Sequence, residues 1–179
     1  MSYENRYSGT QSVGKTTLLN ALRSEQTFKG YTICNEVTRW VKGLGFDINE
    51  SGNDITQELI MMKHVWNVHM YDNMITDRTV LDGLVYTEYL HRNNMVTDNT
   101  LLLATQVFEK IISDYDYLFY IKPEFDLVSD GVRSDNVKFR IEIAALFEEV
   151  IKKYNLNVVN VTGSVRERIV KVMNTIIGE

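Results

Sequence analysis

Residues 9–16 read Gly-Thr-Gln-Ser-Val-Gly-Lys-Thr, which is the complete G-x-x-x-x-G-K-[ST] pattern of a phosphate-binding loop. Its two glycines let the backbone wrap closely around a phosphate, so that successive N–H groups point at the ligand. Lys15 would reach the β- and γ-phosphates, and the Thr16 hydroxyl would take a coordination site on Mg²⁺. The motif predicts a chain that binds a nucleoside triphosphate, with ATP and Mg²⁺ as the expected cofactors.

The loop is expected to lie at the start of a helix, because residues 16–23 place apolar side chains on one face. A helix N-terminus attracts anions, which suits a phosphate site. The segment in front of the loop, residues 2–8, is polar where a buried parallel strand is normally apolar. The first strand is therefore expected to be short, polar or partly at the surface. The residues expected to hold the nucleotide belong to the loop and its helix: Gly9, Gln11, Ser12, Val13, Gly14, Lys15, Thr16 and Thr17.

Size and charge narrow the class of protein. A chain of 179 residues is expected to form a single domain, residues 1–179, with a substantial core. Its formal net charge of −5 argues against a broad nucleic-acid-binding surface, although a local basic groove stays open. Cys34 is the single cysteine, and no apolar run is long enough to span a membrane. These features predict a soluble, cytoplasmic protein, and they set no oligomeric state.

Segments with strand character alternate with segments of helical periodicity along the chain. The expected strands are residues 2–8, 31–35, 74–76, 117–121 and 157–161. The expected helices are residues 16–23, 36–42, 55–71, 80–91, 99–112, 137–154 and 164–177, with Thr97 or Asp98 as the cap of the fifth. Strands separated by helices predict a parallel sheet covered on both faces. The expected fold class is α/β, a three-layer P-loop NTPase sandwich with about five strands.

Ligands of such a sheet bind beyond the carboxyl ends of its strands, so the residues that follow each strand are candidates for the site. The second strand ends at Glu36 and the third at Asp77 and Arg78. Asp77 would hold the metal through water, with Thr16 as a direct ligand. Glu36 would accept a proton from an acceptor hydroxyl, or aim that hydroxyl at the γ-phosphate. Arg39 would flank the same site; the alternative is an exposed ion pair between Arg39 and Glu36.

A lid is expected at residues 124–140, between the fourth strand and the helix after it. Residues 129–133 read Ser-Asp-Gly-Val-Arg and combine a glycine with an arginine. Arg133 would swing onto the γ-phosphate and help to exclude water, which competes with the acceptor in any kinase. The alternative is a solvated helix N-terminus, although basic residues have the wrong sign for that end of a helix.

Motifs in sequence order carry a resemblance to a known family. They are residues 9–17, Asn35-Glu-Val-Thr-Arg39, Thr76-Asp-Arg-Thr-Val-Leu-Asp82 with Tyr86, Tyr115-Asp-Tyr117 and Asp130-Gly-Val-Arg133. Together they resemble the P-loop kinase family typified by the bacterial ribosylnicotinamide kinase domain, the AAA_28 group of ATPases and kinases that is often phage-encoded. The resemblance implies a fold similar to nucleoside and nucleotide kinases. The site residues then expected are Lys15, Glu36, Asp77, Arg78 and Arg133 as catalytic, Glu36, Arg39 and Asp82 at the substrate, and Thr16 and Asp77 at the metal.

The leading expectation is a kinase that moves the γ-phosphate of ATP to a hydroxyl of a nucleoside, nucleotide or related small molecule. An acceptor monophosphate would need further cations, for which Arg39, Lys42 and Arg92 are candidates. A kinase that acts on DNA or RNA, with Trp40 or Trp66 stacked on an unpaired base, is a third interpretation. An NTPase switch that hydrolyses ATP is a fourth.

Residues 55–71 carry both apolar and histidine side chains that need an interpretation. The apolar ones are expected to pack against the sheet: Leu59, Met61, Met62, Trp66 and Met70. His64 and His69 are five residues apart and do not share a helix face as an i, i+4 metal pair would, so no metal site is expected there.

Overall fold

The computed structural model describes residues 5–8, 15–121 and 136–178. Its strands are β1 (Asn5–Ser8), β2 (Thr32–Cys34), β3 (Met74–Asp77), β4 (Tyr117–Tyr120) and β5 (Val158–Asn160). Its α-helices are α1 (Lys15–Leu22), α2 (Val37–Gly43), α3 (Asp54–Met70), α4 (Val80–Arg92), α5 (Asp98–Ile111), α6 (Val137–Lys153) and α7 (Val165–Ile177). Short 3-10 helices cover Gln26–Phe28, Asn49–Ser51 and Ile112–Asp114. The predicted elements from residue 31 onwards are all present, with ends shifted by at most one residue.

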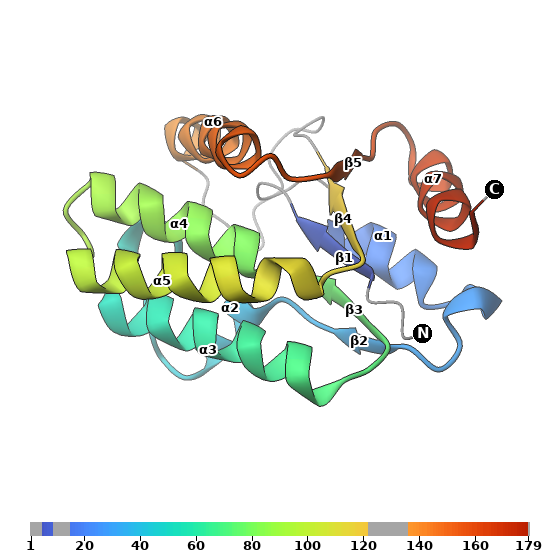
Figure 1. Cartoon of the computed structure of the whole chain (residues 1–179), viewed down its shortest axis with the longest axis horizontal. Helices are drawn as coiled ribbons and strands as arrows, with labels where there is room; N and C mark the ends of the chain where they lie inside the picture. Colours follow the sequence, from blue (N-terminus) through green and yellow to red (C-terminus); the bar gives the residue numbers. More distant parts are fainter. Residues whose placement is uncertain (1–4, 9–14, 122–135, 179) are drawn as a thin grey trace.

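The strands form one parallel sheet in the order β2-β3-β1-β4-β5 (Figure 1). β1 lies at its centre, where Tyr7 is in register with Asp77 of β3 and with Phe119 of β4. The strand is short and polar, as predicted, and its backbone is paired with a neighbouring strand on each side. Parallel pairing satisfies backbone N–H and C=O groups, so a four-residue strand can be central whatever its side chains are.

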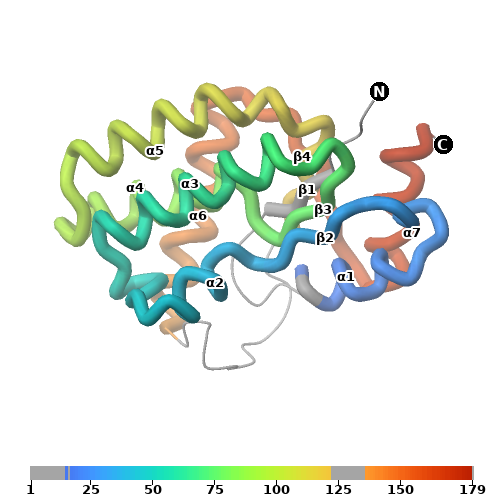
Figure 2. The backbone as a smooth tube through the Cα atoms, turned by 90° about the horizontal axis from the view of Figure 1, so that it is seen from below, coloured from blue at the N-terminus to red at the C-terminus, as the bar shows by residue number. Residues whose placement is uncertain are grey.

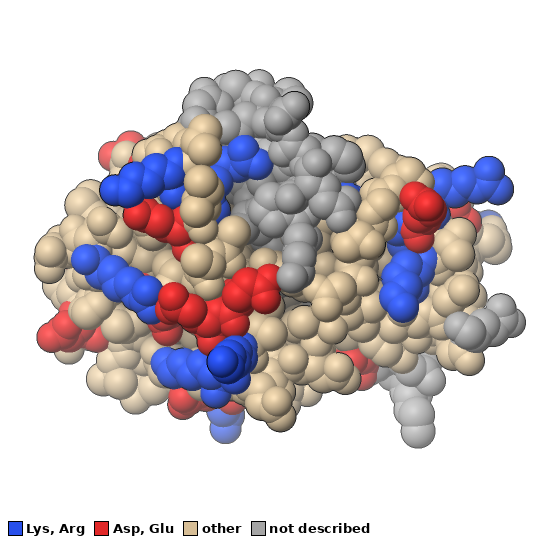
Figure 3. All heavy atoms as spheres, turned by 90° about the horizontal axis from the view of Figure 1, so that it is seen from above, with Lys and Arg blue, Asp and Glu red and all other residues tan. Residues whose placement is uncertain are grey.

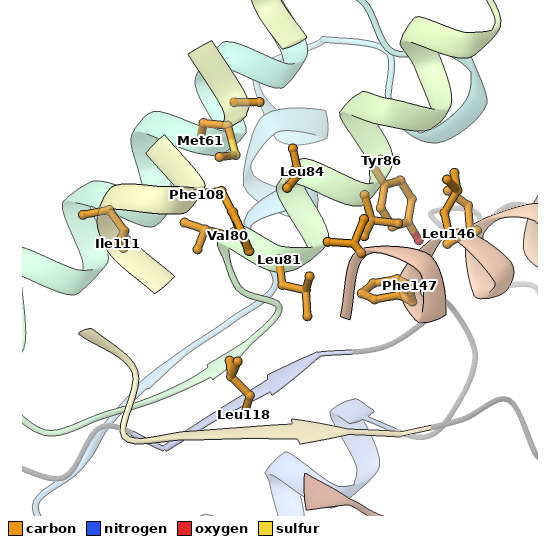
Figure 4. Close-up of a cluster of buried hydrophobic side chains, with 14 of the residues drawn as sticks. Met61, Val80, Leu81, Leu84, Tyr86, Phe108, Ile111, Leu118, Leu146 and Phe147 are labelled. Atoms are coloured by element: carbon orange, nitrogen blue, oxygen red, sulfur yellow. The ribbon is translucent and has the colours of Figure 1, made fainter. Parts of the chain in front are cut away.

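The sheet has one layer of helices on each face, which confirms the three-layer sandwich. Alternate residues of β4 point to opposite faces: Leu118 joins the core with α4, α5 and α6, and Phe119 joins the core with α1 and α7. Figure 4 shows Leu118 below Leu81 of α4 and Phe147 of α6. On the same side of the sheet, α3 packs against α2, α4 and α5 (Figure 2). None of the helices among the described residues combines the length and the apolar character that a bilayer-spanning helix needs.

The outward face of α3 is apolar, which overturns part of the packing prediction. Met61 is buried as predicted, and Leu59 packs beside the small core of α2 and α3. Met62, Trp66 and Met70, however, are 65%, 56% and 54% exposed. The prediction that these three pack against the sheet is wrong.

The inward face of α3 carries the polar side chains. Thr56, Gln57, His64 and Asn67 are all buried, between 0% and 4% exposed. The inward face of the helix therefore combines these polar side chains with buried apolar ones such as Met61, whereas a surface helix usually turns its polar side chains to solvent. Buried polar side chains need hydrogen-bond partners from the protein or from a ligand. The inner face of α3 is therefore a candidate part of the site.

Side-chain caps set where several of these helices begin. The predicted cap of α5 is Thr97, whose hydroxyl accepts a hydrogen bond from the Thr100 N–H at 3.4 Å. The Asn53 side chain caps α3 in the same way. Where α3 meets α4, Gly83 allows close packing, because a Cβ there would collide with the Met61 sulfur. These local features hold α3 and α4 close together beside the carboxyl edge of the sheet.

Candidate active site

Three of the predicted site residues meet at the carboxyl edge of neighbouring strands. Glu36 follows β2, Asp77 ends β3, and Lys15 begins α1 directly after the phosphate-binding loop. Cys34 and Thr76 are in register, so the two strands end side by side. Lys15, Glu36 and Asp77 are 7%, 7% and 3% exposed. A buried cation and two buried carboxylates are thus gathered where the sequence predicted a triphosphate site.

Glu36 is held between two arginines. The Nε and Nη2 atoms of Arg78 lie 2.7 and 2.6 Å from Glu36 Oε1, and Arg39 Nε donates to Oε2 at 3.1 Å. Burial raises the pKa of Glu36, but the charges of Arg78, Lys15 and Arg39 outweigh it, so the pKa is below its ordinary value. Glu36 is therefore an ionised carboxylate at neutral pH. Its Oε2 has one lone pair left for a hydroxyl donor.

Arg78 is fixed by more than its ion pair. Its guanidinium lies 5.0 Å from the centre of the Tyr86 ring and 4.0 Å from Asp82 Oδ1. Its φ is +80°, a conformation that few residues other than glycine adopt, and the Thr76 hydroxyl donates to its carbonyl oxygen at 3.1 Å. Strained backbone of this kind concentrates at functional sites. Burial lowers the pKa of Arg78, but Glu36, Tyr86 and Asp82 together outweigh burial and raise the pKa above its ordinary value.

Lys15 is a buried ammonium group whose pKa is lowered. Burial, followed by repulsion from Arg78, lowers its pKa to about 8, while Asp77, Asp82 and Glu36 act in the opposite direction. A bound polyanion would raise the pKa of Lys15 again and so favour its ammonium form. This is the form that would contact the β- and γ-phosphates.

Asp82, predicted at the substrate, also has a structural task. Its Oδ2 accepts from the Thr79 N–H at 2.9 Å, while the Thr79 hydroxyl accepts from the Leu81 N–H at 3.1 Å. These bonds form a capping box that begins α4 directly after Arg78. The other carboxylate oxygen of Asp82, Oδ1, lies 4.0 Å from Arg78 Nη1. Asp82 therefore also helps to orient the Arg78 guanidinium.

A cleft of about 500 Å³ opens beside Glu36 and Asp77, along the outer edge of β2. Its lining comes from α1, β2, α2, α3 and the end of β3: Leu19, Thr32, Ile33, Cys34, Asn35, Glu36, Val37, Arg39, Trp40, Lys63, Asn67, Tyr71 and Asp77. Trp40 and Tyr71 supply aromatic surface, and Lys63 and Asn67 supply hydrogen-bond donors. This size and lining match sites for drug-sized molecules.

A second, much smaller space of about 10 Å³ lies on the other side of Arg78, between α2, α3 and α4. It is lined by Thr38, Asn49, Gln57, Ile60, His64, Arg78, Asp82, Gly83 and Tyr86. The Thr87 hydroxyl lies 2.7 Å from the Gly83 carbonyl oxygen and 3.1 Å from Gln57 Oε1, so these two acceptors share its one proton. In the sequence, Tyr86 is indicated only by the family resemblance, and no motif indicates Gln57 as a candidate. The spacing of Gln57, His64 and Asn67 on one helix face was the signal, but an apolar stripe with the same period masked it.

Most of the predicted phosphate-binding loop and most of the predicted lid lie outside the described residues. Gly9, Gln11, Ser12, Val13, Gly14, Arg133 and residues 124–135 of the expected lid lie outside the described residues, as does the side chain of Thr16. Thr17 is exposed on α1, and Lys138, in the expected lid, is exposed and 3.7 Å from Glu142.

Arg92 does not join the site. It ends α4, about 20 Å along the helix from Thr79 by the rise per residue, and pairs with Glu149 at 2.8 Å. The prediction that Arg92 could bind an acceptor phosphate is therefore wrong. On the face shown in Figure 3, the described acidic and basic side chains are interspersed, without a basic surface broad enough for a nucleic-acid backbone.

The described residues contain no group of three or more His, Cys, Asp or Glu that could hold a metal ion. A Mg²⁺ ion shared with a nucleotide needs no such group, because it is usually bound through one or two protein ligands plus phosphates and water. Asp77, with its buried carboxylate on the cleft beside Lys15, fits that requirement.

A family model described as an AAA domain, AAA_28, matches residues 7–168. Among curated proteins, none matches. A solved structure of deoxyadenosine kinase from M. mycoides, with the products dCMP and a flexible dCDP bound, is 17% identical, with a TM-score of 0.70 over 98% of this chain and 98% of that chain. The NadR protein in complex with NR is 17% identical, with a TM-score of 0.72 over 97% of this chain and 50% of that chain. The structure therefore has the P-loop kinase fold that the sequence predicted.

Proposed function

This chain belongs to the AAA_28 family, and we propose that it is an ATP-dependent kinase that transfers the γ-phosphate to a hydroxyl group of a nucleoside or a related small molecule. The observation that carries the proposal is the Glu36 carboxylate, kept ionised by Arg78 and Arg39 at the wall of the cleft. Lys15 and Asp77 lie at the same edge of the sheet. This arrangement offers one group for the acceptor and others for the phosphates.

The donor half of the site rests on the phosphate-binding loop, residues 9–16, together with Lys15. Thr16 and Asp77 would hold Mg²⁺, and a bound Mg²⁺ would neutralise charge on the phosphates. The lysine ammonium binds phosphate oxygens. Arg133 is proposed as a further phosphate contact, from the sequence alone.

The acceptor half of the site rests on Glu36. In the transfer, the acceptor oxygen forms a bond to the γ-phosphorus, the bond between the γ-phosphorus and the β,γ-bridging oxygen breaks so that ADP leaves, and the hydroxyl proton passes to Glu36 and from there to water. The low pKa of Glu36 makes it a weak base, so its first task is to accept a hydrogen bond and aim the hydroxyl. Loss of the proton then comes late, which suits a loose transition state with little bonding to the attacking oxygen.

The cleft argues for an acceptor about as large as a nucleoside. Its volume of about 500 Å³ and the aromatic side chains of Trp40 and Tyr71 suit a planar ring with a polar sugar. Gln57 and Tyr86, in the narrow space beside Arg78, would contact the acceptor if α3 and α4 part slightly on binding. The named ligands of the similar structures, dCMP with deoxyadenosine kinase and NR with NadR, support the same class of acceptor.

A nucleoside monophosphate acceptor has less support. It would need a second group of cations near the loop, and Arg92 lies at the far end of α4. Arg39 already pairs with Glu36. We therefore propose that the group that accepts the phosphate is a hydroxyl and not a monophosphate.

The proposal is tested with labelled ATP, Mg²⁺ and a panel of ribonucleosides, deoxyribonucleosides, ribosylnicotinamide, monophosphates and single-stranded oligonucleotides. We expect label to move to at least one nucleoside-type acceptor. Lys15→Ala should abolish the transfer, while Arg92→Ala, which removes an exposed cation outside the site, should leave it unchanged. ATP hydrolysis that no compound alters would favour an NTPase switch and overturn the proposal. Label transferred only to oligonucleotides would assign the acceptor to nucleic acid instead.

A further inference from the structure

Lys63 of α3 places a cation at the wall of the cleft beside Glu36. Its Nζ atom lies 5.7 Å from the centre of the Trp40 ring on α2 and 5.9 Å from the centre of the Trp66 ring on its own helix. An ammonium group is attracted to the face of an indole ring at such distances. Lys63 is therefore held between two tryptophans, and its charge stays beside the cleft that Lys63 and Trp40 both line.

The charge of Lys63 is not balanced by a neighbouring carboxylate. Among the described side chains, no carboxylate lies within ion-pair distance of its ammonium group. The cleft lining contains two carboxylates, and one of them, Glu36, is already paired with Arg78 and Arg39. The other, Asp77, lies at the end of β3, where the proposed Mg²⁺ would bind it. The Lys63 ammonium is therefore free of a competing acidic partner when a ligand enters the cleft.

The position of Glu36 decides which part of an acceptor would meet Lys63. Glu36 is the residue before α2, and Trp40 follows one helical turn later, about 6 Å along the axis. A nucleoside carries its sugar hydroxyl and its base at opposite ends. With the hydroxyl at Glu36, the base would lie at Trp40 beside the Lys63 ammonium. Asn67, four residues after Lys63 on α3, adds an amide group to the same lining.

We propose that Lys63 selects an acceptor whose base is uncharged and offers a carbonyl oxygen or ring nitrogen to its ammonium group. This inference rests on the proposed function and narrows its substrate class. A positively charged ring, such as the pyridinium of ribosylnicotinamide, would be repelled by Lys63. Lys63 also occupies one face of the Trp40 ring, which would otherwise attract a cationic ring. The site therefore favours uncharged nucleosides over ribosylnicotinamide.

The test is the binding of two probes that differ in ring charge and hardly in size: ribosylnicotinamide, whose ring is a cation, and its reduced 1,4-dihydro form, whose ring is neutral. Calorimetry with the full chain, without ATP, gives both dissociation constants. Wild type should bind the neutral form at least about fivefold more tightly than the cationic form. Lys63→Met, which keeps most of the side-chain length and removes the charge, should tighten binding of the cationic form by about fivefold and should not tighten binding of the neutral form.

Two further variants separate the causes. Lys63→Gln removes the charge but keeps a hydrogen-bond donor, so it should lose the discrimination and bind the neutral form more tightly than Lys63→Met does. Lys152→Met removes the same charge from an exposed position on α6 that does not line the cleft, and it should leave the ratio of the two dissociation constants as in wild type. Circular dichroism checks that each variant is folded.

Equal affinity of wild type for the two forms, or a ratio that Lys63→Met leaves unchanged, would overturn the inference. A shift of the same size in Lys152→Met would also overturn it, because the effect would then come from net charge alone. Failure of both forms to bind would remove the wall at Trp40 as the place of the base. Because the measurement omits ATP, it is separate from the kinase assay. Discrimination through Lys63 without transfer of label would overturn the proposed kinase function, and transfer without discrimination would overturn only this inference.

Discussion

Arg78 and Glu36, 42 residues apart in the sequence, form a buried ion pair in which two guanidinium nitrogens meet one carboxylate oxygen, at 2.6 and 2.7 Å. The pair joins the ends of β3 and β2 and leaves the other carboxylate oxygen of Glu36 to Arg39 and the cleft. It keeps Glu36 charged, and it holds the carboxylate in one position. An acceptor hydroxyl therefore meets a fixed hydrogen-bond acceptor.

The first prediction concerns stability. Glu36→Gln should lower the free energy of unfolding by about 3–5 kcal/mol, because it leaves the Arg78 charge buried without its partner. Arg39→Met, which removes a 38% exposed partner of the same carboxylate, should cost less than about 1 kcal/mol. Urea unfolding at neutral pH measures both. Equal and small losses would contradict the assignment of Arg78 as the main partner.

The same pair predicts an acid dependence. The pKa of Glu36 lies below 4.5 in the folded chain, so the folded state holds fewer protons than the unfolded state near that pH. Its contribution to stability is present above pH 4.5 and is lost as the pH falls through the folded-state pKa. The loss of stability of wild type on acidification should therefore be steeper than that of Glu36→Gln. Parallel curves for the two proteins would count against the depressed pKa.

The affinity for ATP should depend on pH through Lys15. The ammonium form binds phosphate, and its pKa in the free protein is about 8. Below that pH the charge is present, so affinity is constant; above it, binding must also take up a proton, and affinity falls by up to about tenfold per pH unit. Calorimetric titrations between roughly pH 7 and pH 9 with Mg²⁺ present test this. Lys15→Gln should bind more weakly and lose the dependence; a wild-type affinity that is flat across this range would refute it.

Asp77→Asn should raise the Mg²⁺ concentration needed for half-maximal phosphoryl transfer by about 10–100-fold, because the proposed magnesium site loses its charged group. Asp72→Asn is the matched control, since Asp72 is exposed and lies before β3, whereas Asp77 is buried at its far end. Magnesium titrations of the initial rate make the comparison. The same response from both variants would remove Asp77 from the metal site.

Gln57→Leu should raise the KM for the acceptor by about 10–100-fold and leave the affinity for ATP unchanged, because the variant loses a buried amide that we propose contacts the acceptor. Thr87→Val removes a hydroxyl that contacts both Gln57 Oε1 and the Gly83 carbonyl oxygen but keeps the amide itself, so a smaller rise is expected. Steady-state kinetics with the acceptor found in the panel give both values. Unchanged KM in Gln57→Leu would confine the acceptor to the wider cleft beside Trp40.

Local patterns in the sequence were enough to predict the elements and the edge of the sheet at which the site lies. The pattern of residues 9–16 predicts a phosphate-binding loop. The alternation of strand and helix periods predicts a parallel sheet covered on both faces. The strand ends can then be read directly, and Glu36 and Asp77 do follow and end neighbouring strands, as predicted. Thr97 was found as a cap because capping is a contact within one turn of the chain.

Tertiary structure alone decided three further matters. It placed the polar strand β1 at the centre of the sheet, through backbone pairing that side chains do not reveal. It paired Arg78 with Glu36, which requires the register of β2 against β3 and an Arg78 φ of +80°. It also turned the Gln57 and His64 side of α3 inward and the Met62 and Trp66 side outward. Both sides of α3 have helical spacing, and only the neighbours that a helix packs against determine which of them is buried.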